Sequence, residues 1–221
     1  MKRIISFILL CILVVFLVNY FLDNKVKVGI LISTYNALGN EQTLALKHFA
    51  RNNSNIGKSS IEYIFKSPKS NEKSFKKAYN ELVKDKVSVI IGPTLSSEAA
   101  FIMDDINKNE IPVISPTVTS HDFIAKKDNF FKIMVTAKRQ SQALSKYLQS
   151  LKKQRVSLLL SSSNRVYSDS FSQDFQTGFA KDETQIIHVS DINSAINSVI
   201  DFKPEVVVFC IQSNELIQLL K

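Results

Sequence analysis

The stretch KVSVIIGPTLSSEAAFIMDDINKNEIPVISPTVTS, residues 86–120, decides the fold of this chain. Its short apolar run at 87–91 is rich in β-branched residues, which is typical of a buried strand in a parallel sheet. Gly92-Pro93 ends that run, and the apolar residues that follow recur at helical spacing. The pair Val113-Ile114 then forms a second apolar run, which Pro116 closes. This order predicts a β-α-β unit with two parallel strands.

Both predicted strands end in small polar residues. The first is followed by Thr94, Ser96 and Ser97, and the second by Thr117, Thr119 and Ser120. Ligands bind outside the carboxyl ends of the strands in an open α/β sheet. The intervening helix also offers unpaired backbone N–H groups and a partial positive charge to an anion. These residues leave two interpretations open, namely ligand contacts, or a helix cap at Ser96 or Ser97 and an ordinary turn at 116–117.

Two segments of this stretch resemble a known family. VSVIIGPTLSSEAA (87–100) and NEIPVISPTVTS (109–120) are similar to the first lobe of the type I periplasmic binding proteins, in the branched-chain amino-acid receptor group. The shared motifs are the Gly-Pro-x-x-Ser-Ser turn and Ile-Pro-x-Ile-Ser-Pro-x-x-Thr. The resemblance extends more weakly from Lys27 to the end of the chain.

The resemblance implies a set of ligand contacts. In the family, the serines after the Gly-Pro turn and the threonine after the Ser-Pro turn bind the α-carboxylate and α-amino groups of the ligand. A glycine-bearing loop after the first strand covers the ligand, and a tyrosine of the second lobe closes on it. Carried over, these contacts are Ser96 or Ser97, Thr117, Thr119, Tyr35 beside Gly39, and Tyr167. Ser168 departs from the family, whose members carry glycine there, and either tyrosine is alternatively an ordinary loop or core aromatic.

Composition supports a folded protein. The chain has 221 residues, 45% hydrophobic and 22% charged, which is ordinary for a globular α/β protein. Its net charge of +8 comes from scattered lysines, without interleaved aromatics or a nucleic-acid motif. We therefore expect solvated helix faces, with weak attraction to anionic lipid head groups as the alternative. Cys11 and Cys210 lie in separate predicted elements, so no disulfide framework is implied.

An apolar segment precedes the first predicted strand. Residues 4–22 are long enough to cross a bilayer as a helix, and Lys2 and Arg3 favour a cytoplasmic amino terminus. No small-x-small cleavage site follows, which favours an uncleaved signal anchor over a cleaved signal peptide. Both interpretations place the bulk of the chain outside the cytoplasm.

Strands alternate with helices throughout, which predicts parallel sheets. Together with the resemblance, this gives an α/β fold of two Rossmann-like lobes. We expect an anchor at 1–25, a first lobe at 26–134 and a partial second lobe at 135–221, since relatives run on further.

The resemblance implies an extracytoplasmic solute-binding protein that serves an ABC permease and takes an amino acid or similar carboxylate. The alternative is the ligand-sensing domain of a membrane-anchored, truncated signalling receptor. A Ser-His-Asp set drawn from Ser96, His121 and Asp122 lacks a nucleophile elbow. The three histidines also lack the spacing of metal ligands. The sequence therefore predicts neither catalysis nor a metal or cofactor.

Overall fold

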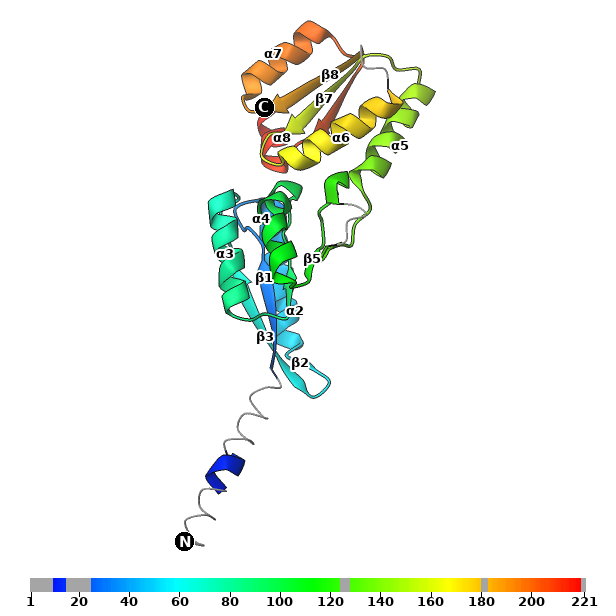
Figure 1. The fold of residues 1–221 in the computed structure, drawn as a ribbon. Coiled ribbons are helices and arrows are strands. Elements are labelled where there is room, and N and C mark those ends of the chain that lie inside the picture. The colour runs from blue at the N-terminus through cyan, green and yellow to red at the C-terminus, as the bar shows by residue number, and fades with distance from the viewer. Residues whose placement is uncertain (1–9, 15–24, 124–127, 180–182, 220–221) are drawn as a thin grey trace, which may run out of the picture.

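The computed structural model describes residues 10–14, 25–123, 128–179 and 183–219 (Figure 1). They form a six-stranded sheet in the order β2-β3-β1-β4-β5-β6 and a three-stranded sheet in the order β8-β7-β9. We call the six-stranded sheet and its helices the first unit, and the three-stranded sheet and its helices the second unit. The chain passes from the first unit to the second once, between β6 and α5.

The first sheet is parallel apart from one edge. Its strands are β1 (Lys25–Leu31), β2 (Asn55–Ile56), β3 (Ser59–Lys66), β4 (Val89–Ile91), β5 (Val113–Ser115) and β6 (Phe130–Lys132). Strand β2 runs antiparallel to β3, so the expectation of parallel strands throughout is wrong there. The reason is local: Gly57, at a φ of 57°, turns the chain back after only two residues, and such a tight hairpin requires antiparallel pairing.

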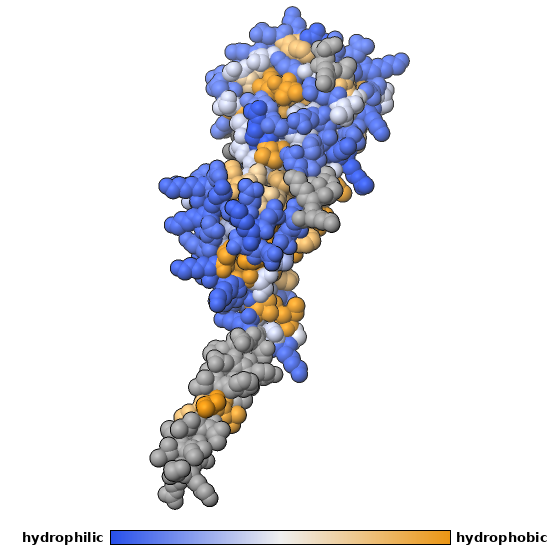
Figure 2. Space-filling model, in the orientation of Figure 1, coloured by the Kyte–Doolittle hydropathy of each residue, from blue (hydrophilic) through white to orange (hydrophobic). Residues whose placement is uncertain are grey.

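In its described residues, the first unit has three α-helices and a 3₁₀ turn. They are α2 (Ala37–Asn52), α3 (Glu72–Lys84), α4 (Ser96–Asn109) and η1 (His121–Phe123). Helices α3 and α4 bury one core against the sheet, in which Phe75, Tyr79 and Ile102 are almost fully removed from water. In Figure 2 hydrophilic side chains dominate the face over α3, consistent with its exposed lysines Lys73 and Lys77.

The second unit is built around β7 (Val156–Ser161), which is buried along its whole length. Its neighbours are β8 (Thr184–Val189) and the edge strand β9 (Val206–Cys210), both parallel to it. One face carries α5 (Ala137–Ser150) and α6 (Arg165–Gly178), and the other carries α7 (Ile192–Phe202) with α8 (Ser213–Leu219). On the α6 face, Phe171, Phe175 and Phe179 stack in sequence over the sheet.

The amino-terminal segment is described only at residues 10–14, which are helical and expose Leu10 and Ile12. The rest of the expected membrane segment, 4–22, lies outside the described residues. Within the described part of the chain, no helix combines the length and the apolar character needed to cross a bilayer.

Candidate functional site

The site begins with the turn after β4. Gly92 has a φ of 117°, and a Cβ on it would lie 2.1 Å from the carbonyl oxygen of Leu31, so the turn requires glycine. The turn buries Thr94, whose hydroxyl donates to Gln42 Oε1 at 2.9 Å. The Thr94 carbonyl accepts from the Thr117 hydroxyl at 2.7 Å. Hydrogen bonds therefore tie together the two hydroxyl-rich strand ends found in the sequence.

The cap of α4 differs from the expectation. Leu95 is the N-cap residue, and Ser96 and Ser97 are the first two residues of the helix. Of the two interpretations left open by the sequence, the one in which Ser96 or Ser97 caps the helix is therefore wrong. The capping role passes to a side chain further along, because Glu98 reaches back over the first turn.

Glu98 closes the amino end of α4 from inside the protein. Its Oε2 accepts from the backbone N–H groups of Leu95 at 3.0 Å and Thr94 at 3.2 Å, and its Oε1 accepts from the Ser70 hydroxyl at 2.6 Å. Burial raises the pKa of Glu98, an effect that these hydrogen bonds oppose. This helix end therefore already has a carboxylate of its own chain.

The structure brings Ser96 beside the segment that holds Thr119. The Ser96 hydroxyl accepts from the backbone N–H of Ser120 at 3.3 Å. Ser96, Thr119 and Ser120 are all buried. The Thr119 carbonyl accepts from the Ala137 N–H at 2.7 Å, at the start of α5. The Thr119 hydroxyl has no hydrogen bond to the described part of the chain, whereas the Ser96 and Ser97 hydroxyls each accept one from a backbone N–H.

Ser97 contacts the second unit directly. Its N–H donates to Asn164 Oδ1 at 3.1 Å, and its hydroxyl accepts from the Val166 N–H at 3.1 Å. The amino ends of α4 and α6 thus face each other, and each supplies a side chain to a backbone N–H of the other. The hydroxyl expected to bind a ligand is here used to join the two units.

A cavity of about 320 Å³ lies between the amino end of α4 and the carboxyl ends of β7 and β9. Its lining residues are Leu95, Ser161, Asn164, Tyr167, Phe209, Cys210, Ile211 and Gln212. Burial raises the pKa of the Tyr167 hydroxyl, and it raises the pKa of the Cys210 thiol to about 11. Both groups are therefore neutral at pH 7. The cavity therefore combines apolar walls with neutral hydroxyl and amide groups.

The predicted contacts are divided by this geometry. Tyr167 lines the cavity, while Ser96, Ser97, Thr117 and Thr119 lie around the adjoining ends of β4 and β5 without lining it. Tyr35 is 67% exposed on the loop before α2. The expectation that Gly39 lies in a loop is wrong: it belongs to the first turn of α2, where the Asn36 side chain accepts from the Gly39 N–H at 2.8 Å.

Sequence reasoning missed the wall that follows β9. Phe209, Cys210, Ile211 and Gln212 lie at and just beyond the end of that strand. The signal that would have found them is the strand-end rule that pointed to Ser96 and Thr119. Asn164 had the same signal, because it closes the run Ser161–Asn164 after β7.

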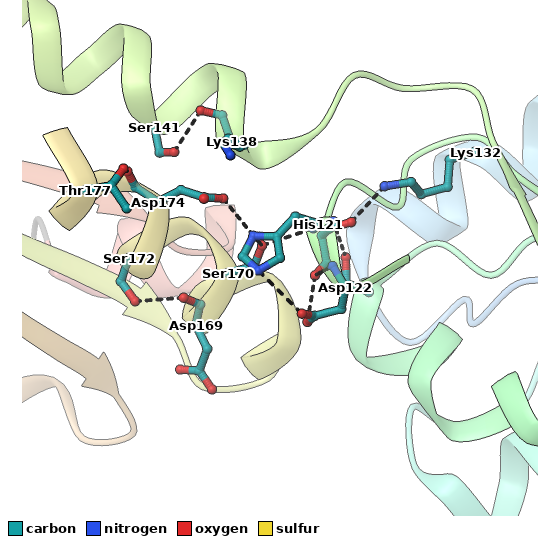
Figure 3. A network of polar contacts seen from close by, with 12 residues as sticks. His121, Asp122, Lys132, Lys138, Ser141, Asp169, Ser170, Ser172, Asp174 and Thr177 are labelled. Carbon is teal, nitrogen blue, oxygen red and sulfur yellow. Dashed lines mark hydrogen bonds and ion pairs between the residues drawn. The ribbon is translucent and has the colours of Figure 1, made fainter. Parts of the chain in front are cut away.

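His121 forms a second polar cluster between the units (Figure 3). Its Nδ1 lies 2.8 Å from both Asp174 Oδ2 and Ser170 Oγ, and its Nε2 lies 3.5 Å from Asp122 Oδ1. The Ser96 hydroxyl contacts the Ser120 N–H and not this ring, so the hypothetical Ser-His-Asp set is not assembled. No group of three or more His, Cys, Asp or Glu side chains in the described residues is arranged to hold a metal ion.

Comparison with known proteins gives a consistent picture. Residues 42–221 match the profile of the family described as "Receptor family ligand binding region". A search of curated proteins found no match. Among solved structures, a leucine binding protein from Thermotoga maritima has a TM-score of 0.72 at 17% identity, and covers 83% of this chain and 55% of its own.

Two further structures extend the range of ligands. A branched-chain amino acid transporter substrate binding protein from Streptococcus pneumoniae, in complex with isoleucine, has a TM-score of 0.70 at 20% identity, over 84% of this chain and 56% of its own. An ABC transporter solute binding protein from R. palustris, in complex with benzoate, has a TM-score of 0.69 at 19% identity, over 84% and 55%. The chain thus spans little more than half the length of these proteins, and shares part of their α/β fold.

Proposed function

The chain belongs to the family described as the receptor family ligand binding region, and we therefore propose that it binds a small solute between its two units without transforming it. The observation that carries this proposal is the cavity of about 320 Å³ at the carboxyl ends of β7 and β9. It lies where parallel sheets bind ligands, and its size is at the lower end of the range for small-molecule sites, roughly 300–1,000 Å³.

The proposed ligand is an amino acid or a related carboxylic acid. The structural neighbours hold isoleucine or benzoate, both of which join an apolar body to a carboxylate. Leu95, Phe209 and Ile211 offer apolar contacts of this kind, and Asn164 and Gln212 offer amide donors. The branched-chain amino-acid group remains our preferred ligand class because of the motifs at 92–97 and 111–119.

We propose a division of roles among the predicted contacts. Tyr167 contacts the ligand from the cavity wall, and Thr119 contributes its free hydroxyl from the first unit. A ligand can bind to the hydroxyls of Ser96, Ser97 and Thr117 only after the protein rearranges and breaks the hydrogen bonds that these hydroxyls now make. Tyr35 closes over the site from its exposed loop. The two lobes would be residues 26–134 and 135–221, moving about the passage between β6 and α5.

We also propose that the protein acts outside the cytoplasm and delivers its ligand to an ABC permease. The apolar run at 4–22 supports attachment to a membrane, which equally suits the ligand-sensing part of a receptor. Retention of the full chain in carbonate-washed membranes would support attachment, and release into the wash would contradict it.

Thermal unfolding of the full chain in mild detergent tests ligand binding. Leucine, isoleucine, valine, benzoate and 4-hydroxybenzoate are added separately at millimolar concentration. At a hundred times its Kd, a ligand stabilises the folded state by about 2.7 kcal/mol, which a melting curve detects easily. We expect at least one compound to raise the midpoint.

The matched variants are Tyr167→Ala, in the cavity wall, and Tyr147→Ala, which is 60% exposed on α5. The first should weaken binding at least about tenfold, since an aromatic contact is removed, and the second should leave binding unchanged. A panel without any shift, or equal binding by both variants, would contradict the proposed site.

A further inference from the structure

The arrangement of the two units depends on non-covalent contacts. The chain crosses between the sheets once, so in the described residues a single covalent passage, 133–136, joins them. Side chains Ile133, Met134 and Val135 of this passage are exposed, so packing does not fix it firmly. One backbone hydrogen bond, from the Ala137 N–H to the Thr119 carbonyl at 2.7 Å, lies at the passage itself. The other hydrogen bonds between the units in the described residues involve α6 or its N-cap residue Asn164.

The amino end of α6 provides the first of these contacts. Asn164 and Val166 exchange hydrogen bonds with Ser97, as described above. The Val166 side chain also packs against the hydrophobic core of the first unit. Two backbone N–H groups, those of Ser97 and Val166, are therefore bonded only while α6 lies against α4.

The middle of α6 provides the second contact, through His121 of the first unit (Figure 3). The His121 backbone N–H donates to the Ser170 hydroxyl oxygen at 3.1 Å. The ring Nδ1 lies 2.8 Å from Asp174 Oδ2, and because that carboxylate oxygen accepts, the ring bonds to it when Nδ1 carries a proton. The Asp174 side chain is only 9% exposed and that of His121 is 29% exposed. Such shielding from water strengthens a charge-assisted hydrogen bond relative to one on the surface.

We propose that His121, held by Ser170 and Asp174, is a latch that keeps the two units in the arrangement that forms the cavity. His121 does not line the cavity, and it acts on a ligand only through the position of α6. Loss of the latch exposes Asp174 to water, where its carboxylate is solvated, so the open arrangement becomes accessible. Ligand affinity then falls, because an apparent Kd rises as the fraction of competent protein falls. That last step rests on the proposed function, whereas the latch itself does not.

Hydrogen exchange in the absence of ligand tests the latch on the full chain in mild detergent. The readout is exchange at the Ser97 and Val166 amides, which lie at the other contact of α6 and are not bonded to His121. We expect His121→Ala to speed exchange at both amides about tenfold, the effect of losing one hydrogen bond to a charged group. His121→Asn keeps an N–H donor near the position of Nδ1 and should restore most of the protection.

The control is His48→Ala, which removes an exposed histidine of α2 and should change neither amide. The urea midpoint of the core strands should stay the same in all of these variants. Unchanged exchange at Ser97 and Val166 in His121→Ala would overturn the latch. If that variant does not fold, Ser170→Ala, which removes one hydroxyl, replaces it. Faster exchange at the Ser97 and Val166 amides would then support the latch, and unchanged exchange would overturn it.

A ligand measurement separates this proposal from the proposed function. If the wild-type chain binds a compound of the panel, His121→Ala should raise its Kd by up to the factor found in exchange, and His121→Asn should bind nearly as well as the wild type. If no compound binds, the proposed function fails while faster exchange at Ser97 and Val166 still establishes the latch. Faster exchange with an unchanged Kd would show that the latch does not govern the site.

Discussion

Glu98 shows how the polar residues at the strand ends serve the chain itself. Its carboxylate, fully removed from water, occupies the amino end of α4 and accepts three hydrogen bonds. Ser97 likewise bonds to α6, and Thr117 bonds to Thr94. Residue types that bind ligands therefore also bind backbone groups, and Thr119 is the one of these whose hydroxyl is free in the described structure.

The burial of Glu98 makes stability depend on pH. Its pKa in the folded protein is raised above the ordinary value of 4.5, so the folded state takes up a proton more readily than the unfolded state. The stability contributed by this group is therefore fully present below pH 4.5 and is lost as the pH rises through the folded pKa. We expect the unfolding free energy of the wild type, relative to Glu98→Gln, to fall as the pH rises from 4 to 7.

Urea unfolding at several pH values measures this difference. Glu41→Gln, at an exposed position on α2, is the matched control and should run parallel to the wild type. If the unfolding free energy of Glu98→Gln also follows that of the wild type at every pH, the pKa of Glu98 is not raised in the folded protein.

The helices and strands were largely predictable, because apolar periodicity fixes them. Apolar spacing predicts a helix at 72–84 and an apolar strand at 206–210, and α3 and β9 have these bounds. The start of α2 depends on the Asn36 side chain, and β2 consists of only two residues, so neither feature leaves an apolar pattern in the sequence. For the site, the pattern located the strand ends, but it carried no information on which hydroxyls are bonded within the protein.

The turn from β4 to α4 provides a sharp test of backbone geometry. Gly92→Ala places a Cβ 2.1 Å from the Leu31 carbonyl oxygen at a φ of 117°, and strain of this kind costs roughly 3 kcal/mol or more. Gly57→Ala, at a φ of 57° with open space around it, should cost only about 1 kcal/mol. Urea denaturation compares the two, and equal losses would contradict the tight turn.

The molecule contains separate hydrophobic cores in its two units. The first is built between α3, α4 and the six-stranded sheet, and the second between α5, α6 and β7. Since the two cores lie in different sheets and one passage of chain joins these in the described residues, each core should unfold with considerable independence. The relation of the units to each other is the feature that the sequence could not predict, because it depends on pairs such as His121 and Asp174, 53 residues apart.

A pair of buried phenylalanines tests this independence. Phe75 belongs to the first core and Phe175 to the second, and both are fully buried. Each substitution by alanine should destabilise its own unit by about 3–5 kcal/mol. Hydrogen exchange should show the loss of protection in β4 for Phe75→Ala and in β7 for Phe175→Ala. If either variant weakens both strands equally, the two units unfold as one.

The edge strand β9 has a practical consequence. It pairs with β7 on one side only within the described structure, and Phe209 on it is 44% exposed next to Ile200 of α7. An unpaired edge strand next to exposed hydrophobic side chains favours edge-to-edge pairing between molecules, which leads to aggregation. Concentrated solutions of the protein should therefore become turbid well below its unfolding temperature. Protein concentration, and not temperature, will then limit the lifetime of a sample.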